Sequence, residues 1–465
     1  MEMGTQGKLV EMGYTALSYF SPYKAWKYYK ELLVNQYLPE ADLQRLQFKK
    51  LKSIIRHAFE NVPFYQNKFK EAGISPEDIK ELDDIQNIPF TTRKELDGAL
   101  PNAVISEGFS WKNLIPIRTS GTSEGKPFQI LMDRECLNRK YALLLRSYSY
   151  LGWHFGKRIM ALWNNSHEDY KPLRERPILK KVIYTWIHQK RLLPPFYRDS
   201  GLTDKKCLDY YNRICAFRPH LIEADTFALY QIGRGFLERD LFPEGIEAIS
   251  SAASPTTFSI RDKLGKMFHS PVYNNYGPHE MEGVACECSE RRGLHQSLDS
   301  YVIEFIRNGK PAAMDEFAEL VLTDLENFAM PLIRYKIGDH IQAGSYPCTC
   351  GRTLPLMHDV EGRTGDVIKT SRGIFTESCL QNFFEKFGLE NQFQMIQKKA
   401  DQIESRIVPS VALNSPLIEK IIKGLNDLLG PEIQVHVERV RAIPCEPSGK
   451  FRPVKSMILG MQGET

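Results

Sequence analysis

The sequence predicts an α/β protein with a large N-terminal domain and a small C-terminal α+β domain. Its 465 residues exceed the usual size of one hydrophobic core, so two domains are expected. Helical and strand-like segments alternate from Glu135 to Tyr276, which is typical of sheets layered with helices. The pattern of apolar and polar residues changes near Gly365, and the segment that follows is expected to have a helix and a strand of its own. We therefore expect domains at 1–364 and 365–465.

The individual elements follow from local periodicity. A helix is expected from Asp42 to Glu60, where Asn61-Val62-Pro63 ends the pattern, and another from Ile418 to Leu429. Short apolar and β-branched runs predict strands at 114–117, 128–131, 301–305, 319–322 and 434–440. The first two of these runs enclose a polar, glycine-rich loop.

Composition narrows the class of protein. Hydrophobic residues make up 42%, charged residues 25% and aromatic residues 11%, as in ordinary soluble globular proteins. The 61 basic residues nearly balance 57 acidic ones, which argues against a nucleic-acid partner. No apolar run approaches the roughly 20 residues that span a bilayer, and no secretory signal is evident. A cytoplasmic location is expected.

Two segments mix basic and aromatic residues. The stretch from Tyr14 to Tyr37 favours an amphipathic helix packed on its own domain over peripheral membrane contact. The stretch from Lys180 to Tyr197 favours a solvated helix over a nucleic-acid surface.

Nine cysteines without a signal peptide indicate a reducing compartment. Cys288 and His295, with Cys348 and Cys350 further along, supply three thiols and an imidazole, a usual tetrahedral zinc set. Cys286 is a spare thiol that could replace Cys288. We expect a structural zinc site within 286–350, because all four ligands come from protein; the alternative is a group of reduced, buried cysteines.

The glycine-rich loop has the chemistry of a phosphate cradle. Hydroxyls and backbone N–H groups donate hydrogen bonds there, and a lysine supplies positive charge. The donors are Thr119, Ser120, Gly121, Thr122, Ser123, Gly125 and Lys126. The glycine spacing and Pro127 exclude a Walker loop. The alternative is an ordinary polar hairpin turn.

Three further motifs carry candidate site residues. Tyr273 to Glu280 offers an aromatic ring for a purine and a carboxylate for Mg²⁺. Asp339 and Arg363 offer a carboxylate for ribose hydroxyls and a guanidinium for a phosphate. Lys450 lies in a glycine-flanked turn and is a mobile point charge. Taken singly, each motif is also a common surface turn.

Together, the order of these motifs resembles that of the acyl-adenylate-forming (ANL) superfamily. The best match is its phenylacetate–CoA ligase-like branch, which includes capsular-polysaccharide-associated relatives. The resemblance begins at Arg45 to Tyr65 and Pro89 to Thr92, ends at Lys450, and so covers nearly the whole chain.

The resemblance implies the adenylate-forming fold and a role for each motif. The loop Thr119–Lys126 would hold the ATP phosphates, and Glu280 would bind Mg²⁺. Asp339 would bind the ribose, and Arg363 the ribose or a phosphate. Lys450, on a mobile C-terminal domain that rotates near Gly365, would bridge the acid and the α-phosphate. Ala252, Ala253 and Tyr276 would lie beside the adenine, and Gly277 and His279, from the same motif as Tyr276, would help to bind the nucleotide.

The implied activity is that of an acid–thiol ligase, in which a carboxylic acid and ATP form acyl-AMP and coenzyme A accepts the acyl group. An amine or hydroxyl acceptor is the alternative, and a non-catalytic nucleotide-binding relative is a third. Three departures from the family pattern bear on turnover: the inserted Glu124, His279 in place of Thr or Ser, and Gly365 in place of Asp.

The acid itself is expected between three segments, Trp163 to Asn165, Glu223 to Thr226 and Ser250 to Ser254. Their mixture of polar and aromatic side chains favours a small polar or aryl acid over a long fatty acid. Dimers are common among the relatives, so a homodimer is also compatible with the resemblance.

Overall fold

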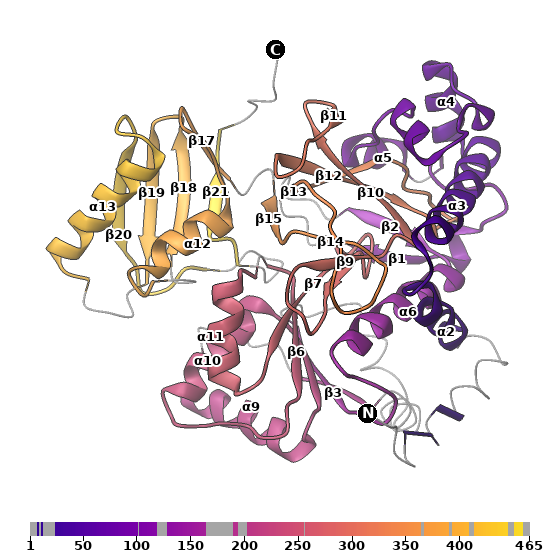
Figure 1. The fold of residues 1–465 in the computed structure, drawn as a ribbon. Helices are drawn as coiled ribbons and strands as arrows, with labels where there is room; N and C mark the ends of the chain where they lie inside the picture. The colour runs from indigo at the N-terminus through magenta and orange to yellow at the C-terminus, as the bar shows by residue number, and fades with distance from the viewer. Residues whose placement is uncertain are drawn as a thin grey trace.

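The structure is a computed structural model, and its described residues are 7–8, 11–12, 24–100, 102–118, 128–163, 189–193, 202–254, 256–363, 367–389, 393–408, 413–444 and 451–458. Figure 1 shows a helical N-terminal layer, two sheets in the middle of the chain and a separate C-terminal sheet. The predicted α/β class is confirmed.

The N-terminal layer is helical, as its periodicity predicted. The helix expected from Asp42 to Glu60 is α3 (Glu40–Asn61), and α4 (Pro63–Ala72) begins with proline at its first position, where no N–H is needed. The remaining elements of this layer are α2 (Ala25–Asn35), η1 (Pro76–Asp78), η2 (Leu82–Asn87), α5 (Arg93–Ala99) and η3 (Trp111–Asn113).

The central sheet has eight strands in the order β14-β9-β8-β7-β6-β5-β3-β4. The five from β7 to β4 are parallel, and the pairs beyond β7 are antiparallel. Their bounds are β3 (Ile159–Leu162), β4 (Lys190–Leu192), β5 (Leu221–Asp225), β6 (Ala248–Ala252), β7 (Val272–Tyr276), β8 (Ala285–Glu287), β9 (Leu294–Gln296) and β14 (Leu356–Met357).

Both faces of this sheet are covered by other elements, as is usual for parallel strands. One face packs on α9 (Asp204–Phe217), α10 (Thr226–Leu237) and α11 (Phe258–Phe268). The other face shares a core with α6 (Arg134–Tyr150) and the second sheet. Each of the four helices begins after a side-chain N-cap, which fixes where it leaves the sheet: Asp133, Thr203, Asp225 and Thr257.

The second sheet has the order β11-β10-β12-β13-β15, and all its pairs are antiparallel. Its bounds are β10 (Tyr301–Arg307), β11 (Lys310–Pro311), β12 (Phe317–Asp324), β13 (Tyr335–Gln342) and β15 (Val360–Arg363). Strands β1 (Ile115–Arg118) and β2 (Gln129–Met132) form the predicted hairpin on either side of the glycine-rich loop.

The C-terminal residues build their own core around a four-stranded sheet of order β20-β19-β18-β21. The predicted helix and strand are α13 (Ser415–Leu429) and β20 (Gln434–Arg439). The other elements are β16 (Ile368–Thr370), β17 (Gly373–Phe375), α12 (Glu377–Glu385), β18 (Phe393–Lys399), β19 (Gln402–Ile407) and β21 (Val454–Ser456). None of the described helices is long and apolar enough to cross a membrane.

The two basic aromatic segments have different outcomes. In the first, α2 buries Trp26, Tyr28 and Tyr29 in the N-terminal core, so the helix packed on its own domain is confirmed for these residues. In the second, the described part is the strand β4 and not a helix. The solvated-helix prediction is wrong there, because pairing with β3 overrides local propensity.

Buried ion pairs join α6 to the rest of the N-terminal region. Lys140 Nζ lies 2.6 Å from Asp324 Oδ1, and Arg146 Nη1 lies 2.7 Å from Asp299 Oδ2. Asn35 of α2 donates to the same Asp299 oxygen at 3.2 Å. The ion-paired side chains are at most 4% exposed, so neither charge of a pair has access to solvent once its partner is removed.

Asp299→Ala should therefore destabilise the fold by about 3–5 kcal/mol, since the Arg146 guanidinium would stay buried without a carboxylate. Urea unfolding followed by circular dichroism measures the change. The control is Asp209→Ala, whose pair with Arg213 is 49% and 53% exposed and should cost less than about 1 kcal/mol. Equal costs for the two variants would contradict the structural role of Asp299.

Candidate functional site

The carboxyl ends of the parallel strands meet at one edge of the central sheet. The residues at these ends are Trp163 after β3, Asp225 in β5, Ala252 in β6 and Tyr276 in β7. Open parallel sheets bind their ligands at this edge, because the loops that leave it can diverge around a ligand. All four residues were assigned to the site or its acid pocket from sequence segments far apart in the chain.

The turn after β6 is held in an unusual backbone conformation. Ala253 has φ of 71°, a left-handed value that is uncommon for any residue with a Cβ atom. The buried Thr226 hydroxyl stabilises this turn through Ser251 Oγ at 2.8 Å and the Ala252 carbonyl at 3.1 Å. Such strain concentrates at ligand-binding turns, and Ala252 and Ala253 are the residues expected beside the adenine.

Tyr276, Asp339 and Arg363 form one hydrogen-bonded group. The Tyr276 hydroxyl donates to Asp339 Oδ2 at 2.6 Å, and Arg363 Nε donates to Asp339 Oδ1 at 3.2 Å. Asp339 and Arg363 are direct neighbours across β13 and β15, which explains their contact. Burial and the Asp339 charge raise the pKa of Tyr276 well above its usual value, so its hydroxyl keeps its proton.

Glu280 has the properties of a cation ligand. Its side chain is buried, and Oε2 has no hydrogen-bond partner among the described atoms. Burial raises the pKa of this carboxyl, while the charge of Arg363 opposes the rise. A buried carboxylate oxygen without a donor is costly unless a cation or water satisfies it, so Glu280 fits a Mg²⁺ ion.

The backbone beside Glu280 leaves no room for side chains at Gly277. A Cβ atom there would lie 2.7 Å from the backbone nitrogen of Gly283, so only glycine fits. His279 is exposed. The chain approaches itself closely at Gly277, which directly follows the last residue of β7, and Glu280 lies three residues further along.

One residue of this group was not singled out from the sequence. The positive charge of Arg93, at the start of α5, lowers the pKa of Glu280 and that of Tyr335 against the effect of burial. Its guanidinium lies 5.4 Å from the ring centre of Phe128, beside β2. Arg93 directly follows the Pro89 to Thr92 motif, so that motif was the available signal.

Several predicted site residues lie outside the described part of the chain. They are the phosphate-loop residues Thr119, Ser120, Gly121, Thr122, Ser123, Gly125 and Lys126, the inserted Glu124, the hinge residue Gly365, and Lys450. Asn164 and Asn165 of the expected acid pocket also lie outside it.

The acid-pocket segments carry a buried ion pair. Glu223 of β5 accepts from Trp163 Nε1 at 3.0 Å, and Lys190 of β4 lies 2.5 Å from the same oxygen, Oε1. Burial has the largest effect on both groups: it raises the pKa of Glu223 and lowers that of Lys190 to about 8. Sequence reasoning did not assign Lys190, because its partner lies two strands away in the sheet.

The C-terminal module contacts the central sheet close to the same edge. Phe451 stacks on Phe227, with ring centres 4.3 Å apart and planes 13° from parallel. Lys263 of α11 also pairs with Glu385 of α12 at 3.0 Å. Phe227 is in the first turn of α10, directly after Asp225 and Thr226, and Phe451 directly follows Lys450 in the sequence.

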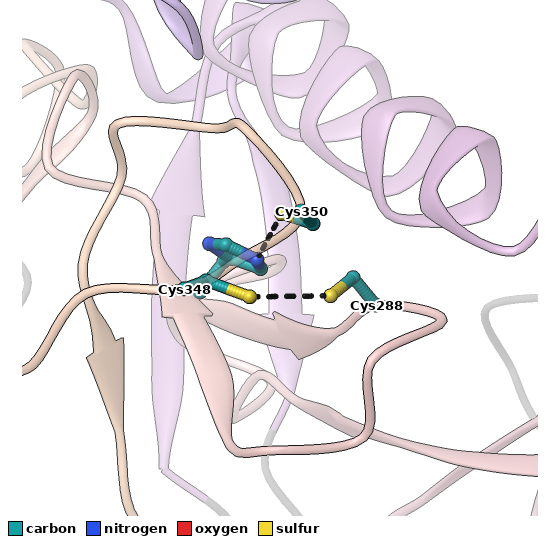
Figure 2. A group of neighbouring side chains, drawn as sticks. Cys288, Cys348 and Cys350 are labelled. Carbon is teal, nitrogen blue, oxygen red and sulfur yellow. Dashed lines mark hydrogen bonds between the residues drawn. The ribbon is translucent and has the colours of Figure 1, made fainter.

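The four expected zinc ligands lie together. Cys288 follows β8, His295 is in β9, and Cys348 and Cys350 come from one loop before β14 (Figure 2). Their ligand atoms all lie within 4.8 Å of one another. Cys286 is not among the four, so it stays outside the cluster.

The spacing of these atoms fits a tetrahedral zinc ion. Zn–S bonds of about 2.3 Å require sulfur atoms about 3.8 Å apart, and Cys288 Sγ and Cys348 Sγ are 3.8 Å apart. His295 Nδ1 lies 2.7 Å from the Leu354 carbonyl, so Nδ1 carries the proton and Nε2 keeps its lone pair. That Nε2 lies 3.3 Å from Cys350 Sγ.

Comparisons with known proteins agree with this geometry. A family model described as the CapK C-terminal domain matches residues 367–457. A phenylacetate-coenzyme A ligase of Thermus thermophilus is 26% identical over 348 residues, 71% of this chain and 72% of the ligase. Protein CapK of Staphylococcus aureus is 25% identical over 422 residues, 88% of each chain. The crystal structure of a 2-hydroxyisobutyryl-CoA ligase in the postadenylation state has a TM-score of 0.73 at 17% identity, over 91% of each chain.

The chain resembles the acyl-adenylate-forming superfamily. Its sequence is similar to phenylacetate-coenzyme A ligases and to CapK, and its fold is similar to that of an adenylate-forming CoA ligase. The same 2-hydroxyisobutyryl-CoA ligase in its thioesterification state has a TM-score of only 0.59 with this chain. The structure of this chain is thus more similar to the first of these two states.

Phe451→Ala should loosen the contact between the C-terminal module and α10. An aromatic pair contributes about 0.5–1.5 kcal/mol beyond its buried area, so the docked population should fall by about 2- to 12-fold. Hydrogen exchange measured by mass spectrometry should rise in peptides covering 226–232 and 451–458. Phe258→Ala is the control, because that ring on α11 is 58% exposed. Unchanged exchange at 226–232 in Phe451→Ala would contradict the contact.

Proposed function

We propose that this chain activates a small carboxylic acid with ATP, releases pyrophosphate and transfers the acyl group to coenzyme A. The observation that carries the proposal is the group formed by Tyr276, Asp339, Arg363 and Glu280 at the carboxyl edge of the sheet. It supplies a ring, two carboxylates and a guanidinium where two separate motifs of the sequence meet. Domains 1–364 and 365–465 would share this work.

The nucleotide would be held by residues from both sheets. Each Asp339 oxygen accepts one hydrogen bond, and a carboxylate has about four acceptor positions, which leaves positions for the two ribose hydroxyls. Ala252, Ala253 and Tyr276 would border the adenine, and the loop Thr119–Lys126 would hold the phosphates. Arg363 would contact the ribose or the α-phosphate.

The first step joins two anions, and the site residues would offset their repulsion. An oxygen of the acid's carboxylate attacks the α-phosphorus, the bond from that phosphorus to the β-phosphate oxygen breaks, and pyrophosphate leaves with the electron pair. Mg²⁺ held by Glu280 would supply charge neutralisation when bound. Arg363 and Lys450 would contribute positive charge at the α-phosphate and the carboxylate.

The domain contact supports a position for Lys450 near this step. Phe451 is buried against Phe227, which lies two residues beyond Asp225, the last residue of β5 and the N-cap of α10. Adjacent Cα atoms are about 3.8 Å apart, so an anchored Phe451 restricts where Lys450 can reach. The higher TM-score to the postadenylation state than to the thioesterification state is in line with this arrangement.

An amine or a hydroxyl acceptor is the second candidate. The match of residues 367–457 to the CapK C-terminal domain supports keeping this candidate, because that description, unlike those of the ligases, names no coenzyme A. Adenylation is common to both candidates, so the acceptor can be tested after the acid is known. A mass shift in coenzyme A would support the thioester, whereas product formation only with added amines or sugars would support the alternative.

The first test is acid-dependent exchange of pyrophosphate into ATP, with panels of aryl, hydroxy, amino and short aliphatic acids. At least one acid should support exchange, and magnesium chelation should abolish it. Lys450→Ala should lower the exchange rate by about 10²- to 10³-fold, the usual loss when one group that stabilises transition-state charge is removed.

The matched control is Lys420→Ala, which removes an exposed lysine from α13 of the same module and should leave the exchange rate unchanged. Folded protein that binds ATP but supports no exchange with any acid would favour the non-catalytic nucleotide-binding alternative.

The zinc site would have a structural role in this function, since four protein ligands leave no open coordination position. Purified protein should contain about one zinc per chain by elemental analysis. Cys348→Ser should lower zinc content and the midpoint of thermal unfolding, because metal-binding energy contributes to folding. The control is Cys286→Ser, which lies outside the four ligands and should keep its zinc. Full zinc content in Cys348→Ser would contradict the assignment.

A further inference from the structure

Glu223 lies deeper in the site than the residues assigned to the nucleotide. It is paired side by side with Ala161 of β3 and Ser250 of β6, two residues before Asp225 at the end of its strand. A strand rises about 3.3 Å per residue, so Glu223 lies roughly 6–7 Å below the carboxyl edge. Its side chain points to the sheet face opposite α9, α10 and α11, because Ile222 and Ala224 occupy that helix-covered core.

Only one of its two carboxylate oxygens is satisfied. Oε1 accepts from Trp163 and pairs with Lys190, whereas Oε2 has no hydrogen-bond partner among the described residues. The side chain is only 4% exposed, so this oxygen has little contact with bulk water, and a donor on a bound ligand would supply its hydrogen bond. The neighbouring Ser250 is 3% exposed and offers a hydroxyl on the same face.

The charges around this oxygen favour a donor. Lys190 carries one positive charge, and Glu223 and Glu282 carry one negative charge each when ionised. Beyond the effect of burial, the charge of Glu282 raises the pKa of Glu223, so the two carboxyl groups lie close enough to interact. The nearby Lys140 is already paired with Asp324. Among the described residues the surroundings of Oε2 are therefore negative, which disfavours an acceptor or a second carboxylate on the ligand.

We propose that the acid taken by this site carries a hydrogen-bond donor, a hydroxyl or an amino group, and that Oε2 of Glu223 accepts its hydrogen bond. This inference rests on the proposed function, since it describes the acid that is adenylated. The depth of Glu223 sets the donor about 6–7 Å from the acid's carboxylate, a distance that an aryl ring with a para substituent spans. Glu223 is then the residue that determines specificity.

The consequence is a strong preference between matched acids. A site built to hydrogen-bond a substrate hydroxyl or amine rejects the analogue without it by up to about 10⁴- to 10⁵-fold, because the buried acceptor stays unpaired. The probes are phenylacetate, 4-hydroxyphenylacetate, 4-aminophenylacetate and 4-(aminomethyl)benzoate, compared by kcat/KM in pyrophosphate exchange. We expect at least one donor-bearing acid to exceed phenylacetate by at least about 100-fold. 4-Aminophenylacetate carries a neutral aromatic amine and 4-(aminomethyl)benzoate carries an ammonium group, so comparing these two acids shows which kind of donor the site prefers.

Two substitutions assign this preference to Glu223. Glu223→Ala should reduce the donor-to-phenylacetate ratio to within about 10-fold. Glu223→Gln should also lower it and should improve 4-acetylphenylacetate, since an amide N–H₂ can donate to an acceptor on the acid. The ratio compares two acids with the same preparation of each variant. A smaller folded fraction lowers both kcat/KM values equally and leaves their ratio unchanged. Glu223→Ala combined with Lys190→Met removes both charges and guards against misfolding from an unpaired Lys190.

The outcomes separate this inference from the function on which it rests. Equal exchange with phenylacetate and the donor-bearing acids, or a preference that survives Glu223→Ala, would overturn the role of Glu223 and leave adenylation standing. Exchange with no acid of this panel or the wider one would overturn both. A preference that is lost in Glu223→Ala and in the double variant would establish the role of Glu223 in choosing the acid.

Discussion

The parallel pairing of β3, β5, β6 and β7 is the constraint on which the rest of this structure depends. Parallel neighbours end on the same side of a sheet, so the backbone hydrogen bonds of four strands bring residues from 162 to 276 to a single edge. Trp163, Asp225, Ala252 and Tyr276 are neighbours for this reason alone. The side chains at that edge then need only short loops, such as the strained turn at Ala253, to surround a nucleotide.

The second sheet completes the site, and it is joined to the first through α6 by a shared apolar core and by buried ion pairs. Lys140 and Arg146 project from α6 to Asp324 and Asp299, which end or precede strands of the second sheet. With that docking in place, Asp339 of β13 reaches Tyr276 of β7, and Arg363 of β15 reaches Asp339. The buried pairs contribute little net stability compared with apolar residues. Their value here is in fixing one relative position of the two layers.

Two other features tie distant segments to this frame. The Cys and His cluster joins the ends of β8 and β9 to the loop before β14, and β8 is paired with β7 beside Tyr276. The Phe227–Phe451 stack joins the C-terminal module to α10. A bound zinc ion would hold the first connection in place, whereas a single aromatic stack contributes only about 0.5–1.5 kcal/mol beyond its buried area. The first connection lies beside the strand that carries Tyr276, and the second lies at the start of α10.

The sequence by itself determined the fold class, most element positions and the four motifs, since periodicity, Pro63 and the spacing of glycines and cysteines are local properties. It also predicted Glu223 and Trp163 as acid-site residues, and the structure brings these two side chains into contact. Only the tertiary structure decided that Lys190 lies in a strand and pairs with Glu223, that Arg93 acts on Glu280, and that Cys286 stays outside the cysteine cluster. These relations depend on strand order and on which face a side chain occupies. Strand order and side-chain face cannot be read from the spacing of neighbouring residues, because both depend on pairing between segments tens of residues apart.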